Sequence, residues 1–140
     1  MKANIKIDGI GEFKLASVGY GFNQMVDASG RPTSEVLCNQ IALSIFPEVA
    51  NGPDAGEYSN SLFQWMIDGS QSHDGTIEYY TSEKEDQVLK TLAFKGAFCV
   101  SFSENMTAIS GERITQDILI AVAELDVEGD TYKNMWRKGL

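Results

Sequence analysis

The chain has 140 residues, 43% of them hydrophobic and 22% charged, and its 20 acidic and 11 basic side chains give a net charge of -9. This composition is typical of one soluble globular domain, and no apolar run is long enough for a membrane helix. The acidic balance argues against nucleic acid and anionic membranes as partners, since both repel negative charge. Residues 1–6 lack the apolar stretch of a signal peptide, so the chain is expected to fold in the cytoplasm.

The first strands are predicted from residue 5 onward. Ile5 and Ile7 alternate with polar residues, and the turn that follows predicts an opening hairpin with residues 13–15. In residues 17–23, the even-numbered positions carry bulky side chains and the odd-numbered positions, called the small parity, carry small or polar ones. The small parity consists of Ser17, Gly19, Gly21 and Asn23. The two faces must meet different environments, and the glycines allow either an open wall or a tight strand crossing inside one barrel.

Residues 26–34 are rich in turn formers and lack periodicity, which predicts a long loop outside the sheet. Strand character returns over 36–46 and ends at Pro47, which has no amide hydrogen for the ladder. A second loop is predicted for residues 48–57, because proline, glycine and asparagine gather there.

One helix is predicted, beginning near Ser59 or Asn60 as its cap and ending by residue 69. The spacing of four apolar residues gathers them on one side as the buried face, namely Leu62, Phe63, Met66 and Ile67. Trp65 is interpreted as an anchor against the sheet. A single short helix cannot build a second core, so it is expected to cover an edge of the β-structure.

Three further strands follow the helix. Residues 76–80 form the first, and a charged turn leads to a long strand with large apolar side chains at 92, 94, 98, 100 and 102. Gly96 interrupts that series and marks a possible bulge. The last strand, 113–127, is apolar on both parities, which predicts that both its faces are buried and that a partner subunit covers one.

These elements predict a mainly β fold, an antiparallel barrel or sandwich with one flanking helix, built as a single domain over residues 1–140 with its core at about 4–128. The C-terminal segment 129–140 lies outside that core. Cys38 and Cys99 each sit in an apolar strand-like run, so we expect two buried free thiols.

Catalytic and metal sites are not predicted. His73 lies in a turn with no nucleophile motif nearby, and one histidine with two distant cysteines is a poor metal set. The acidic groups at 83–86 and at Asp126 and Glu128 are typical of solvated turns, although paired carboxylates leave a hydrolase as one alternative. No cofactor is expected, because no glycine-rich phosphate cradle precedes a helix.

Four segments in this order resemble the tube protein of type VI secretion systems, the Hcp or TssD family, in the branch found in Bacteroidetes. They are the strand 19–24, the loop 26–34, the helical segment 62–66 and the strand 89–94. The Asp-x-x-Gly-Arg-Pro sequence of the loop and the Leu-Phe-x-Trp-Met sequence of the helix are the more specific of these.

The resemblance implies a structural subunit and not an enzyme. Six copies would form a ring, rings would stack into a hollow tube, and the tube would meet a spike protein, a contractile sheath and small effectors. It would assemble in the cytoplasm and be secreted through the apparatus without a signal peptide. The loop residues implied to contact a neighbouring subunit or ring are Asp27, Ser29, Gly30, Arg31, Pro32 and Thr33. The small parity from Ser17 to Asn23 would face the lumen.

Two alternatives follow from the residues alone. A monomeric β-barrel that binds a small apolar ligand would have the same alternation. Arg31 is either a solvated turn residue or a guanidinium that pairs with a neighbour's carboxylate or carbonyl groups.

Overall fold

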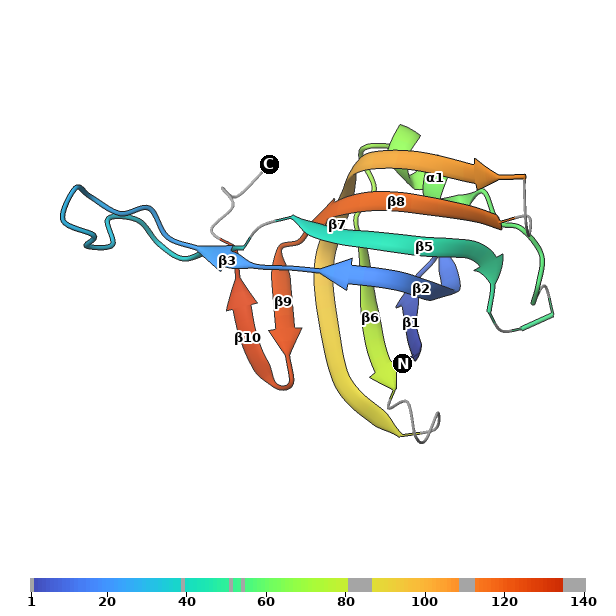
Figure 1. Ribbon diagram of the computed structural model, residues 1–140, viewed down its shortest axis with the longest axis horizontal. Coiled ribbons are helices and arrows are strands. Elements are labelled where there is room, and N and C mark those ends of the chain that lie inside the picture. Colours follow the sequence, from blue (N-terminus) through green and yellow to red (C-terminus); the bar gives the residue numbers. More distant parts are fainter. Residues whose placement is uncertain are drawn as a thin grey trace.

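The structure, a computed structural model, describes residues 2–38, 40–50, 52–53, 55–80, 87–108 and 113–134. Antiparallel strands dominate it, with one short helix lying against them (Figure 1). The predicted fold class is confirmed. The elements are β1 (Lys2–Ile7), β2 (Gly11–Gly19), β3 (Phe22–Asn23), β4 (Leu37–Cys38), β5 (Ile41–Val49), α1 (Ser61–Ile67), β6 (His73–Tyr80), β7 (Val88–Thr107), β8 (Arg113–Ala121), β9 (Glu124–Val127) and β10 (Asp130–Lys133).

The main sheet closes on itself through its longest strand. The strand order is β10-β9-β7-β6-β1-β2-β5-β8, and β8 also pairs with β7. The first half of β7 pairs with β9, and the second half, from Phe98 to Thr107, pairs with β8. One 20-residue strand therefore serves two neighbours on the same edge, which turns the sheet into a barrel.

A bulge at Gly96 allows β7 to change neighbours. Gly96 has φ of +62°, and the register slips between the pairs His73–Ala97 and Gly75–Phe94. The predicted bulge is confirmed, but the expected continuous apolar face of β7 is wrong. Beyond Gly96 the buried residues are Ala97 and Cys99, and Val100 is exposed, because an extra residue in one strand shifts the side-chain alternation by one.

The core fills the inside of this barrel. It is aliphatic and aromatic, and most of its side chains are fully enclosed. Its members are Ile5, Ile7, Phe13, Leu15, Ile41, Leu43, Ile45, Leu62, Trp65, Ile77, Leu92, Phe94, Ala97, Cys99, Ile118, Ile120, Val122 and Leu125. At about 25 cal/mol per Å² of apolar surface removed from water, this burial is the main stabilising term of the fold.

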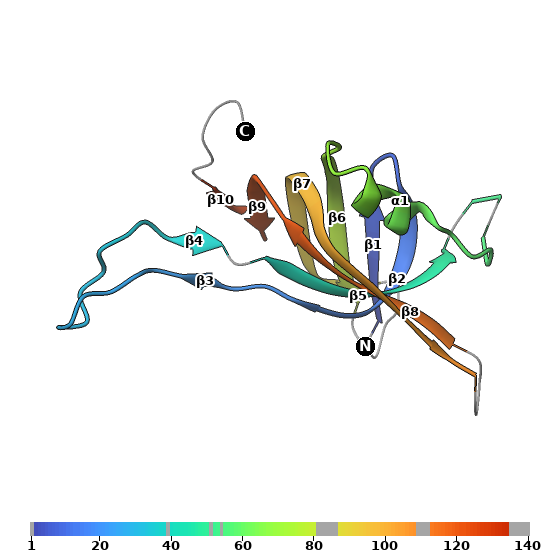
Figure 2. The ribbon, with the colours of Figure 1, turned by 90° about the horizontal axis from the view of Figure 1, so that it is seen from above.

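Helix α1 packs on β7 and covers one opening of the barrel (Figure 2). Asn60 occupies the cap position, as predicted, although its side chain makes no capping hydrogen bond. The predicted apolar face is only half correct. Leu62 is buried and Met66 packs half-buried against the core, but Phe63 and Ile67 are 41% and 68% exposed. The other buried residue of the helix is Trp65, three residues after Leu62. The anchor role of Trp65 is confirmed, and its indole N–H donates to the carbonyl of Gln71 at 3.0 Å.

The last predicted strand is two strands in the structure. β8 ends at Ala121 and β9 begins at Glu124, and the break reverses the alternation, so Val122 and Leu125 both enter the core. The prediction of one strand with two buried faces is therefore wrong, and the partner's cover inferred from it stays a prediction. Apolar residues on both parities are explained by a change of parity within the chain.

Cys38 and Cys99 form no disulfide in the described part of the chain, and the predicted burial of both holds fully only for Cys99. Cys99 is buried beside the sulfur of Met66 at 3.8 Å, whereas Cys38 is only half-buried at the edge of the barrel. Burial raises the pKa of both thiols above its ordinary value. Among the described segments, no helix has the length and apolarity required to cross a bilayer.

Candidate assembly surfaces

Residues 22–38, called the arm from here on, project from the barrel as a long hairpin (Figure 2). The arm continues β2 outward and returns into β5. Phe22 pairs with Cys38 and Asn23 with Leu37 near its base, and Val26 pairs with Pro32 near its tip. The predicted loop is thus a ribbon with backbone pairing at both ends and no core beneath it.

The tip of the arm is a turn built around the carboxylate of Asp27. Its Oδ1 accepts hydrogen bonds from the amide of Ser29 at 2.9 Å, the hydroxyl of Ser29 at 2.7 Å and the amide of Arg31 at 3.0 Å. The Ser29 hydroxyl bond, followed by the backbone bonds of Arg31 and Ser29, lowers the pKa of Asp27 below its ordinary value. Gly30 completes the turn with φ of +87°, a left-handed conformation that other residues adopt at a cost.

The predicted contact residues are brought together by this turn. Asp27, Ser29, Gly30, Arg31, Pro32 and Thr33 all lie exposed at or next to the tip. Thr33 also returns a hydrogen bond from its amide to the carbonyl of Met25 at 2.8 Å. The shape of the tip is therefore set by its own backbone and by one carboxylate, and the side chain of Arg31 is left free of the turn.

The sides of the arm expose apolar side chains. Met25 and Val26 are 64% and 60% exposed, and Phe22, Val36 and Leu37 are each exposed by 40–42%. Such side chains are common singly on a surface, but here five of them share one ribbon. The arm thus presents apolar surface in a segment that cannot bury it locally.

The base of the arm is tied to the barrel by Tyr132 of β10. Its hydroxyl donates to the carbonyl of Val36, and its ring meets Phe22 edge to face at 5.1 Å between centroids. Sequence reasoning missed this residue. The available signal was a tyrosine in a short polar strand just after the turn at Gly129, where an aromatic side chain has no core position to fill.

The second surface is the outer face of β2, β5, β7 and β8, here called the small-residue face. Cross-strand pairs join Ser17 with Ser44, Gly19 with Ala42, and Ser103 with Asp117. A shallow hollow of about 420 Å³ lies over these positions.

Two of the four predicted lumen residues lie on this face. Ser17 and Gly19 belong to it, but Gly21 and Asn23 lie beyond the end of β2, where Asn23 pairs within the arm. A Cβ placed on Gly19 would meet nothing within 4 Å, so the alternative of a tight strand crossing does not hold at this glycine.

Sequence reasoning did not assign to this face the residues that three other strands contribute. The alternation Ala42 and Ser44 in one strand, and Ser101 and Ser103 in another, was visible, but only the register places them side by side with β2. Asp117 and Leu119 complete the face from β8.

The groups considered for catalysis have structural roles. The Nδ1 of His73 lies 2.8 Å from the carbonyl oxygen of Asp8, and its ring stands edge-on to Trp65. Asp126 accepts from the amide of Gly129, and Glu128 from that of Thr91, each at 2.8 Å. The other acidic group considered, at 83–86, lies outside the described residues. Within the described part of the chain, no three His, Cys, Asp or Glu side chains gather as metal ligands.

The matching family model and the matching solved structures indicate the same protein family. The family model of the hemolysin coregulated protein Hcp (TssD) matches residues 1–137. Among solved structures, Hcp1 from Flavobacterium johnsoniae is 25% identical, with a TM-score of 0.79 over 96% of this chain and 100% of that one. No curated protein matches.

More distant structures share the fold. Hcp1 from Salmonella typhimurium is 12% identical, with a TM-score of 0.65 over 94% of this chain and 90% of that one. The secreted protein Hcp3 from Pseudomonas aeruginosa is also 12% identical, with a TM-score of 0.58 over 98% and 99% of the two chains. The arrangement of strands is therefore retained even though few residues are identical.

Proposed function

Because this chain belongs to the Hcp (TssD) family of type VI secretion tube proteins, we propose that six copies form a ring and that rings stack into the hollow inner tube. The tube would assemble in the cytoplasm, be driven outward by a contractile sheath behind a spike protein, and be secreted through the apparatus. Small effectors would travel in its lumen. In this role the protein works by its shape and not by a reactive side chain.

The observation that carries the proposal is the small-residue face. A channel wall must face water with few bulky apolar groups. Four adjacent strands here present glycine, alanine, serine and one aspartate toward the outside, with Leu119 as the bulky apolar side chain among them. Ser17 and Gly19 are the predicted lumen residues that this face retains. Their strand neighbours Ala42, Ser44, Ser101 and Ser103 extend the wall around the barrel.

The arm supplies the contact between subunits. Its apolar sides are exposed in one copy, and burying them against a second copy would remove that surface from water. The tip residues Asp27 to Thr33 would then meet an adjacent subunit or the next ring. A preformed turn lowers the entropy lost on docking, because its backbone is already fixed by the Asp27 hydrogen bonds.

The alternative of a monomeric barrel for a small apolar ligand has less support. The barrel interior is filled by its own side chains, with Ile5, Phe13 and Leu125 fully buried. The hollow over the small-residue face is shallow and lined mainly by small or polar groups. Neither site offers the enclosed apolar volume that such a ligand requires.

The test combines mass measurement with electron microscopy of the purified protein. The unaltered chain is expected to give rings with six times the mass of one chain. Replacing Gly30→Val and Arg31→Glu together should reduce rings or tubes by about tenfold or more, since both the turn and its charge change. Lys6→Glu, which makes the same charge change at an exposed position of β1 outside the arm, is the control and should assemble normally.

Two results would contradict the proposal. A chain that stays monomeric at every concentration would exclude the tube. Rings as abundant in the double variant as in the unaltered protein would exclude the assigned role of the arm.

A further inference from the structure

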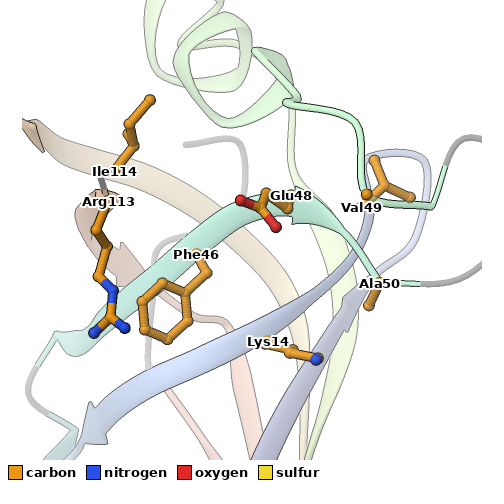
Figure 3. Close-up of a pocket in the computed structure, with 8 residues that line it drawn as sticks. Lys14, Phe46, Glu48, Val49, Ala50, Arg113 and Ile114 are labelled. Carbon is orange, nitrogen blue, oxygen red and sulfur yellow. The ribbon is translucent and has the colours of Figure 1, made fainter. Parts of the chain in front are cut away.

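A charged cleft lies at the end of the barrel opposite the arm. The arm joins the end of β2 to the start of β5, whereas the cleft uses the start of β2, the end of β5 and the start of β8. Its volume is about 480 Å³. The lining residues are Lys14, Phe46, Glu48, Val49, Ala50, Gly56, Arg113 and Ile114 (Figure 3).

Two cations from different strands flank one aromatic ring in this cleft. The guanidinium of Arg113 lies 5.4 Å from the ring centroid of Phe46, and Lys14 pairs with Phe46 across the ladder (Figure 3). A cation held over an aromatic face is oriented by the ring quadrupole, which fixes where Arg113 presents its N–H groups. The cleft thus places two positive charges and one negative charge, that of Glu48, in a chain whose net charge is -9.

Both cations are left without a carboxylate partner in the described part of the chain. The ion pair found there joins Lys133 and Glu124 at 3.5 Å, far from the cleft in the fold. Glu48 lines the cleft but forms no ion pair with Lys14 or Arg113 among those residues. Unpaired cations beside an apolar ring are suited to bind a carboxylate that arrives with apolar neighbours.

The wall of the cleft is held in place by backbone hydrogen bonds. The amide of Val49 donates to the carbonyl of Glu57 at 2.9 Å, and the amide of Gly56 returns a bond to Val49 at 2.8 Å. The amide of Ala50 donates to the carbonyl of Glu12 at 2.8 Å, which ties the loop to β2. The cleft is therefore formed before any ligand binds.

We propose that this cleft receives the tip of the arm from a second copy of the chain. The proposal rests on the assembly proposed above and names the surface that the arm contacts. The turn uses only Oδ1 of Asp27, so Oδ2 is left to accept from Lys14 and Arg113 of the second copy. The side chain of Arg31, which the turn does not use, would meet Glu48 on the rim.

The positions of the two surfaces fit a contact between unlike patches. An interface in which one patch meets a different patch can repeat from copy to copy, and it forms rings or open stacks. The arm continues one end of β2 and β5 (Figure 1), and the residues that line the cleft come from the other end of these strands, as such a contact requires. The apolar neighbours also match, because Val26 and Pro32 at the tip would lie against Phe46, Val49 and Ile114.

A charge swap tests the pairing of Arg31 with Glu48. Arg31→Glu and Glu48→Lys are each expected to raise the protein concentration needed for assembly by about tenfold, because like charges would face each other. The double variant should restore assembly to within about threefold of the unaltered protein. Recovery in the double variant identifies the two residues as neighbours across the contact.

The two cations are tested by a separate variant. Lys14→Glu with Arg113→Glu should abolish assembly, while thermal melting of the barrel reports whether the variant still folds. Lys6→Glu with Lys95→Glu, at exposed positions of β1 and β7 outside the cleft, makes the same change in net charge and should assemble almost normally. Sodium acetate at millimolar concentration is the small-carboxylate probe, followed by the NMR signal of the Arg113 side chain.

The outcomes separate the two proposals. If the unaltered chain forms tubes but the charge swap shows no rescue, the arm binds elsewhere and the proposed function still stands. If acetate shifts Arg113 and the cleft variants assemble normally, the cleft is a site for small carboxylates, which overturns docking of the arm. If the unaltered chain never assembles, both proposals fail.

Discussion

The arm and the barrel are parts of the same two strands, yet they are stabilised in different ways. Along the barrel, β2 and β5 enclose Phe13 and Ile45 completely. Past its end, the same strands continue as a ribbon whose Met25 and Val26 are mostly exposed and whose order comes from hydrogen bonds around Asp27. The barrel thus buries its apolar side chains within one chain, whereas the arm is held by local hydrogen bonds and leaves apolar surface exposed for a partner.

The largest expected effect is a difference in the free energy of unfolding between a core substitution and an arm substitution. Phe94→Ala should lower the free energy of unfolding by about 3–5 kcal/mol, because Phe94 is buried against the barrel interior and the truncation leaves a cavity. Val26→Ala should change it by no more than about 0.5 kcal/mol, since the side chain is exposed in a single copy. Urea denaturation of the monomer measures both. Equal losses would mean that the arm belongs to the core's cooperative unit.

Ionic strength should act on assembly and leave the barrel unaffected. The six copies of the proposed ring would carry 6 × -9 = -54 charges. Their repulsion would reach about 30 Å at 0.01 M salt but only about 8 Å at 0.15 M. Contacts between opposite charges buried at an interface are screened less. Ring stacking is therefore expected to weaken at low salt, as measured by light scattering and microscopy. Stacking that is unchanged from low to high salt would contradict this expectation.

The sequence predicted the alternating strands, the helix and the long loop, because hydrophobic periodicity and turn residues are local signals. It failed where alternation changes parity inside a segment. The bulge at Gly96 and the break before Glu124 each move side chains to the opposite face, and a pattern read with one fixed parity cannot follow that.

The surfaces were harder to predict than the strands. Ser17 and Ser44 become neighbours only through the register between β2 and β5, which depends on bulges in that ladder. The cleft needs Lys14, Phe46 and Arg113 from three strands, and no spacing in the sequence indicates that they meet. The arm tip was predictable because all its contacts lie within a few residues of Asp27.

Substitutions at two glycines should have opposite effects, because Gly19 lies on the open small-residue face and Gly30 lies in the left-handed turn of the arm. Gly19→Ala should stabilise the monomer by about 0.4–1 kcal/mol, because its added methyl meets open space and its backbone is not left-handed. Gly30→Ala should instead disturb the arm tip, where φ is +87°, with little effect on unfolding of the barrel. Chemical denaturation measures the first change, and amide exchange at the tip measures the second. A destabilised Gly19→Ala variant would mean that the small-residue face is packed.

The smallest effect is confined to the arm and depends on pH. Hydrogen bonds from Ser29 and Arg31 to the ionised carboxylate hold the pKa of Asp27 below its ordinary value. A depressed pKa contributes stability that is fully present above the unfolded value of about 3.9 and is lost as the pH falls through the folded value. The turn should therefore be unchanged from pH 7 to 5 and should loosen only in stronger acid.

NMR amide shifts of Ser29 and Arg31 follow that change, with the buried strand residue Ile5 as the internal reference. Asp27→Asn keeps an acceptor oxygen but removes the titrating group, so its tip should lose the pH dependence. If the tip and Ile5 shift together in the unaltered protein, acid acts on the whole fold, and the arm is not the independently shaped element that its hydrogen bonds indicate.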